Sequence, residues 1–221
     1  MRLKIFYLIL KKDLVLFFRS RASFWATTLF VGGYLALLRL GLPPQETPLA
    51  VGVSFMVATQ LTASVFLLLF GQVWEREWNA IAYILQLRVS PLALYLAKLV
   101  AYFMALMVLW LILHLIGFLF FKLTSHNLIV WSFLGTGFFL SMNASAIGAL
   151  ASGISFQTRY RELIMFLIYI PLILPVGIAA ATFYRTLALY GKIGREGFFL
   201  TSLFFFFFSL GIFFYEHLLR D

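Results

Sequence analysis

Six apolar stretches separated by short polar connections constrain this chain more than any other feature. They run over 23–42, 49–73, 92–121, 128–156, 163–184 and 197–215. A helix needs about 20 apolar residues to cross the hydrocarbon core of a bilayer, and each stretch has about that length or more. Only 11% of the residues are charged, whereas a soluble domain carries about 25% charge. The sequence therefore predicts an all-α polytopic membrane protein with six transmembrane helices in a single domain over 1–221.

The basic residues are distributed unevenly between the two ends of these predicted spans. One side would hold Arg2, Lys4, Lys11, Lys12, Arg19, Arg21, Arg76, Arg88, Lys98, Arg159, Arg161 and Arg220. The other would hold Arg39, Lys122, Arg185, Lys192 and Arg195. The positive-inside rule then predicts that both termini are cytoplasmic. Lys98 lies near the start of the third stretch, where we expect its side chain to extend to the membrane surface.

Residues 1–21 have the pattern of an amphipathic helix. The basic residues that fall on one arc of about 100° of a helical wheel are Lys4, Lys11, Lys12 and Arg19. The apolar residues that fall largely elsewhere are Ile5, Leu8, Ile9, Val15 and Leu16. We expect this segment to lie in the cytoplasmic interface, and the alternative is a frayed leader with ordinary positive-inside charges. We expect no cleaved signal peptide, because no small-x-small site closes the first apolar stretch.

The connection between the second and third stretches is the longest polar interruption on the predicted inner side. It begins Trp74-Glu75-Arg76-Glu77-Trp78-Asn79 and ends at Ser90-Pro91. Its alternating charges and aromatic anchors predict a short cytoplasmic coupling helix, because a rigid element passes on the motion of a soluble motor where a flexible loop absorbs it. A solvated loop with interfacial tryptophans is the alternative.

Two prolines interrupt the fifth stretch, which follows the charged turn of Arg159, Arg161 and Glu162. Pro171 and Pro175 each leave a backbone carbonyl without its amide donor, and in a membrane this is tolerated where protein or water fills the gap. We therefore predict that this helix is a hinge that moves or faces a substrate.

The fourth stretch contains small residues at intervals of four, namely Ala144, Gly148 and Ser152, beside the polar Asn143. Small residues at this spacing let helices approach closely, and an asparagine can hydrogen-bond across the contact. Helix packing is the favoured role of this face over substrate contact. The phenylalanine-rich run 203–208 in the sixth stretch is expected to face lipid.

Catalytic and metal-binding patterns are missing from the sequence. The chain has no cysteine, no phosphate-cradling loop and no paired intramembrane carboxylates, so neither a catalytic residue nor a metal site is predicted. Without an acid near the centre of a span, an ion-coupled transporter is disfavoured. His114 and His126 are weak candidates for haem contact, since no second ligand has a matching spacing. The net charge of +9 lies at the ends of apolar spans, a pattern that disfavours nucleic-acid binding.

These features together resemble the haem exporter protein B family (CcmB type) over nearly the whole chain. The resemblance is strongest in Glu75-Arg76-Glu77 with Asn79-Ala80 and Ser90-Pro91, in Tyr95 to Lys98, and in Arg159-x-Arg161-Glu162-Leu163 before Pro171-x-x-x-Pro175. The segment 81–89 departs from the family pattern, since it is longer than the usual leucine run before the Ser-Pro. The register of the coupling helix relative to the family is therefore open.

The resemblance implies a permease subunit of an ABC-type complex in cytochrome c maturation, in a bacterial or archaeal cytoplasmic membrane. Its implied partners are a separate ATPase subunit that binds ATP, other membrane maturation subunits, and a periplasmic haem chaperone; a homodimer is compatible with it. Haem is then the transported or handled ligand, and this chain is not itself an enzyme. The alternative is a membrane scaffold through which no substrate passes and which relays ATP-driven motion to release the haem-loaded chaperone.

Overall fold

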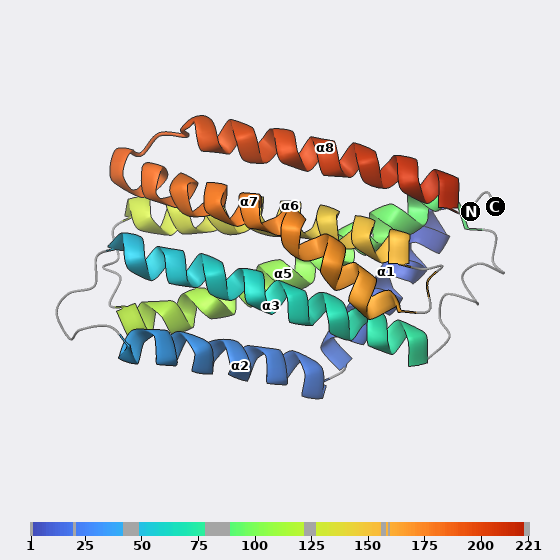
Figure 1. Cartoon of the computed structure of the whole chain (residues 1–221), viewed down its shortest axis with the longest axis horizontal. Coiled ribbons are helices and arrows are strands. Elements are labelled where there is room, and N and C mark those ends of the chain that lie inside the picture. The colour runs from blue at the N-terminus through green and yellow to red at the C-terminus, as the bar shows by residue number, and fades with distance from the viewer. Residues whose placement is uncertain are drawn as a thin grey trace.

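A computed structural model describes residues 2–19, 21–41, 49–77, 89–121, 127–155, 158 and 160–218. Its helices are α1 (Arg2–Arg19), α2 (Arg21–Leu40), α3 (Leu49–Glu77), α5 (Pro91–Phe121), α6 (Asn127–Ser155), α7 (Arg161–Tyr190) and α8 (Arg195–Leu218). The described residues form no strand, so the predicted all-α class is confirmed. Figure 1 shows the longer helices side by side in an elongated bundle, with α1 at the end where α3 and α8 finish.

Five helices are long and apolar enough to cross a membrane. These are α3, α5, α6, α7 and α8, whereas the apolar part of α2 is the shorter segment Trp25–Leu40. A polytopic membrane protein is confirmed in this coarser form. The place of α2 as a sixth span stays a prediction.

Local capping explains where two of the helices begin and end. Ser90 precedes α5, and the backbone N–H of Ala93 donates to Ser90 Oγ at 3.4 Å. Pro91 occupies the first helical position, where its missing N–H costs nothing. At the other end of the bundle, α7 continues to Tyr190, beyond the predicted end at 184. It stops at Gly191, whose φ of 63° is the left-handed conformation that glycine adopts readily.

The helix α6 occupies the centre of the bundle and packs most extensively on α7, α8 and α5. Polar side chains join α6 to its neighbours by donating to backbone carbonyls. Asn143 Nδ2 donates to Leu200 O of α8 at 3.1 Å, and Trp110 Nε1 of α5 donates to Phe133 O at 3.1 Å. Without water as a competitor, such bonds between helices help to fix their register.

Glycines on α6 allow close approaches to large neighbouring side chains. A Cβ at Gly148 would lie 2.8 Å from a methyl carbon of Leu68 on α3, and a Cβ at Gly137 would overlap the Trp110 indole. The small residues of α6 therefore lie at helix contacts, and Gly148 is one of them. At Gly137 the rigid, buried indole fills the space that a side chain would need, so glycine is required there.

The aromatic run 203–208 was expected to face lipid, but only part of it lies on the surface of the bundle. Phe205 and Phe206 are about 60% exposed, but Phe204 and Phe207 are buried against the core. The prediction was therefore wrong for Phe204 and Phe207, because a helix of uniformly apolar residues still turns one face to its neighbours.

The prolines of α7 lie within one continuous helix, and both side chains are exposed. Figure 1 shows α7 changing direction partway along its length. A helix commonly bends at proline because the ring displaces the preceding turn. A hinge motion at Pro171 and Pro175 stays a prediction.

Candidate functional site

Four charged side chains from three helices meet where the last turn of α3 and the beginning of α5 approach the second half of α1. We call Lys12, Asp13, Glu75 and Lys98 the charge cluster. Lys98 Nζ lies 2.5 Å from Glu75 Oε1, and Lys12 Nζ lies 3.3 Å from the same oxygen. Lys12 Nζ also lies 2.7 Å from Asp13 Oδ1. Two lysines thus face two carboxylates, and the formal charges balance.

The charge cluster is largely withdrawn from solvent. The exposed fractions are 1% for Lys98, 3% for Glu75 and 4% for Asp13. Burying a charge is costly unless an opposite charge lies beside it. The expectation that Lys98 extends to the membrane surface was therefore wrong: its ammonium group turns inward because Glu75 accepts its hydrogen bond.

Helix geometry explains how Glu75 and Lys98 meet. The helix α3 continues to Glu77, past the predicted end of the span at 73, and this extra turn brings Glu75 into the bundle. Lys98 lies about two turns from the start of α5 at Pro91. The pair therefore joins the last turn of α3 to the beginning of α5, across the connection that the sequence identifies as the coupling segment.

The helix α1 reaches the charge cluster by docking on α5. Its buried positions Ile9, Asp13 and Phe17 are spaced by four residues and share one face. The Phe17 ring packs edge-on against Tyr102 of α5, with centroids 5.5 Å apart. Leu8 and Val15 of the predicted apolar face are exposed, as in a helix that turns this face to lipid, and the place of α1 in the cytoplasmic interface stays a prediction.

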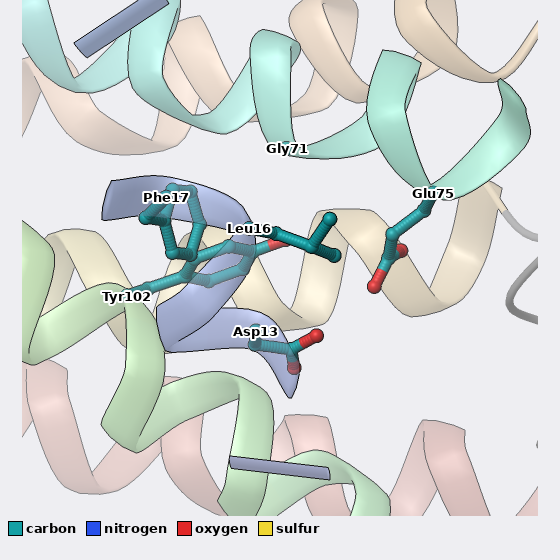
Figure 2. A pocket seen from close by; sticks show the side chains of 6 residues that line it. All are labelled: Asp13, Leu16, Phe17, Gly71, Glu75 and Tyr102. Carbon is teal, nitrogen blue, oxygen red and sulfur yellow. The ribbon is translucent and has the colours of Figure 1, made fainter. Parts of the chain in front are cut away.

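A small cavity of about 10 Å³ opens between the two carboxylates. It is lined by Asp13, Leu16, Phe17, Gly71, Glu75 and Tyr102, and Figure 2 shows the two carboxylates pointing toward one another across it. This volume is near the minimum that holds one water. Asp13 Oδ2 and Glu75 Oε2 accept no hydrogen bond from a described residue, so the cavity has acceptors to offer to a small donor.

Burial raises the pKa of the Asp13 carboxyl above its ordinary value, although the positive charges of Lys98 and Lys12 act in the opposite direction. The negative charge of Glu75 adds to the rise. Burial disfavours the charged form of a carboxyl group because the interior solvates it poorly. Of the two carboxyl groups in the charge cluster, Asp13 is thus the one that binds a proton more readily.

A second polar contact supports α3 one turn before Glu75. Gln72 Nε2 donates to Ser152 Oγ of α6 at 2.5 Å. Ser152 is one of the small residues predicted to pack helices, and it is fully buried. The end of α3 is therefore held by α6 on one side and by α5 and α1 on the other.

The predicted coupling residues lie at the same end of the bundle as the charge cluster. Residues 74–77 form the last turn of α3, and Ser90 and Pro91 begin α5. Trp78 and Asn79 lie outside the described residues. Arg161 and Glu162 begin α7 and are partly buried, while Arg159 is outside the described residues. Figure 1 shows the start of α7 at the end of the bundle where α3 finishes.

The two histidines are not brought to the charge cluster. His114 lies further along α5 and stacks on Phe133, with ring centroids 3.6 Å apart. His126 falls outside the described residues. Within the described parts of the chain, no three His, Cys, Asp or Glu side chains are grouped as metal ligands. A haem contact by His114 stays a prediction.

Sequence reasoning missed Asp13 and the pairing of Glu75 with Lys98. One signal was available: Asp13 is the single acidic residue before Glu46, and it is spaced by four from both Ile9 and Phe17. An acid at the centre of an apolar helical stripe indicates a buried partner. The partner itself lies far along the chain and could not be read from local spacing.

A family model described as CcmB protein matches residues 4–220 of the chain. The match includes all seven helices of the described residues, except for the first two positions of α1. It also includes every member of the charge cluster. No curated protein matches the chain.

Proposed function

The chain belongs to the CcmB family, and from this premise we propose that the connection between α3 and α5 receives force from a separate ATPase subunit. Membership implies a multi-pass membrane component of a haem-exporting, ABC-type system in cytochrome c maturation. We place ATP hydrolysis in the partner chain. We also propose that both termini and this connection face the cytoplasm of a bacterial or archaeal cell.

The observation that supports this proposal most is the 2.5 Å contact between Lys98 and Glu75. It fastens the two helices that flank the connection, so that a push on the connection reaches α5 and α3 together. The Ser90 cap gives α5 a defined beginning, and rigid elements with a few fixed contacts are what pass motion over a distance. In this scheme Glu75, which is buried in the bundle, holds the α3 end of the connection to α5.

Contact with the ATPase then belongs to the residues beyond Glu75. Because Glu75 is 3% exposed, we assign the docking contacts to Arg76, Glu77, Trp78 and Asn79. The turn of Arg159, Arg161 and Glu162 is a second contact at the same end of the bundle. We propose that α7, bent at its prolines, is the helix that changes shape.

A second candidate function is favoured by the filled centre of the bundle. Large side chains such as Trp110, Tyr169 and Tyr215 are at most 1% exposed, and a tightly packed interior offers little space for a flat macrocycle within one chain. In this alternative the protein is a scaffold that relays ATP-driven motion to release a haem-loaded periplasmic chaperone. Transport would require a path at a contact between chains.

Haem flux into sealed vesicles distinguishes the two functions. Vesicles containing this protein and its ATPase subunit should accumulate haem when ATP is supplied, and a non-hydrolysable analogue should abolish the uptake. Haem is followed by absorbance after the vesicles are separated from free haem. No uptake with ATP, together with ATP-dependent chaperone release once the other maturation subunits are added, would contradict the permease and support the scaffold.

A further inference from the structure

A groove opens between α7 and α8 at the end of the bundle opposite the charge cluster. Its volume is about 390 Å³, and its lining includes Ile178, Ala179 and Thr182 of α7 with Arg195, Glu196 and Phe199 of α8. Figure 1 shows these two helices side by side, joined by a short turn at this end. The groove shares no lining residue with the cavity at the charge cluster.

The wall of the groove is apolar and faces outward. Ile178 is 69% exposed and Phe199 is 49% exposed. In a span that crosses hydrocarbon, such side chains are covered by an acyl chain or by another protein surface. The charged residues at the mouth of the groove indicate which of the two, an acyl chain or a protein surface, covers these side chains.

The mouth of the groove presents a cation and an acceptor next to each other. Arg195 is exposed, and no described residue forms an ion pair with it. Glu196 is partly buried, and its Oε2 accepts no hydrogen bond from a described residue. Both belong to the first turn of α8, where free backbone N–H groups add partial positive charge.

We propose that this groove binds a phospholipid with a phosphoethanolamine headgroup. The phosphate meets the Arg195 guanidinium at the start of α8, a pairing that this planar side chain favours. The ammonium group donates to the Glu196 carboxylate, and an acyl chain lies against Ile178 and Phe199. Each charge of the headgroup thus meets a charge of opposite sign at the mouth of the groove.

Two other occupants match the groove less well. Phosphatidylcholine carries a quaternary nitrogen without N–H, so it cannot donate a hydrogen bond to Glu196. A second copy of this chain would desolvate Arg195 and Glu196, and this costs free energy unless each finds a partner in the contact. A lipid headgroup supplies both partners and remains hydrated at the membrane surface.

Lipid retention tests the proposal on the full-length protein. The protein is reconstituted in equal amounts of phosphatidylethanolamine and phosphatidylcholine, washed with detergent, and its retained lipids are quantified by mass spectrometry. We expect about tenfold enrichment of phosphatidylethanolamine, the factor given by one charge-assisted contact. Glu196→Gln should remove the enrichment, whereas Arg195→Gln should lower the retention of both lipids, because both carry the phosphate. Gel filtration confirms that the variants are folded.

Arg185→Gln provides a matched control, because Arg185 is an exposed arginine of α7 that does not line the groove. It should retain lipid as the wild-type chain does. Equal retention of the two lipids by the wild-type chain would overturn the proposal. So would enrichment that survives Glu196→Gln, or retention of both lipids that Arg195→Gln leaves unchanged.

Discussion

Replacing Glu75 with leucine should lower the free energy of unfolding by about 3–5 kcal/mol, because the substitution leaves a buried lysine without its anion. Lys98 is 1% exposed and lies 2.5 Å from the lost carboxylate. Lys98→Met should have a similar effect, since Glu75 would then be left with Lys12 alone at 3.3 Å. Unfolding in detergent, followed by tryptophan fluorescence over a denaturant titration, measures the loss.

The double variant Glu75→Leu/Lys98→Met provides the decisive comparison. Replacing both members of a buried ion pair by apolar residues of similar volume is often neutral, so the double variant should regain most of the lost stability. Glu216→Gln is the control, because Glu216 is an exposed carboxylate on α8 whose loss should cost little. If the two single losses simply add in the double variant, the pairing of Glu75 with Lys98 is contradicted.

Cytochrome c maturation with the same double variant separates stability from force transmission. The proposed function predicts low maturation despite restored stability. Contacts between apolar groups are not directional, so they fix α3 relative to α5 less well than the hydrogen-bonded ion pair does. Full maturation would assign the pair a purely structural role.

Gly137→Leu is expected to give the second large effect, a loss of at least the 1–3 kcal/mol typical of an overpacked core. Any Cβ at position 137 would overlap the indole of Trp110. Trp110 is 1% exposed and donates from Nε1 to Phe133 O, so it cannot turn away without leaving its buried indole N–H unpaired. The same unfolding titration measures the loss, and Gly137→Ala should give a smaller one of the same sign.

Gly33→Ala is the matched control for the glycine series. Gly33 also lies within a helix, but apart from the adjoining backbone no described atom lies within 4 Å of the position of its Cβ. Alanine there should raise stability by about 0.5–1 kcal/mol, since glycine is the poorer helix former. Equal effects at the two positions would show that glycine acts through helix propensity and not through the α5–α6 contact.

Hydropathy and local turn chemistry predicted the helices well, because both depend only on residues that are adjacent in the sequence. The apolar stretch from 92 predicts a helix, and the Ser-Pro before it predicts where α5 begins. The extra turn of α3 up to Glu77 was not predicted, since charged residues lower the hydropathy without ending a helix. Hydropathy therefore located the spans better than the helix ends.

The candidate site was only half visible in the sequence. Glu75 was predicted from its motif, but its burial was not, because the motif says nothing about Lys98 on another helix or Asp13 on a third. Lys98 by itself indicates a lysine at a membrane surface. The buried pairing depends on contacts between residues far apart in the chain, and those require the packed structure.

Cross-linking from single cysteines tests most directly whether an ATPase subunit contacts the connection between α3 and α5. The chain has no cysteine, so Asn79→Cys and Lys192→Cys each introduce one thiol, at opposite ends of the predicted membrane domain. With a thiol-to-amine cross-linker, the complex should yield a product with the ATPase subunit from position 79 and none from position 192. A product from 192 alone, or from neither position in an active complex, would contradict the account.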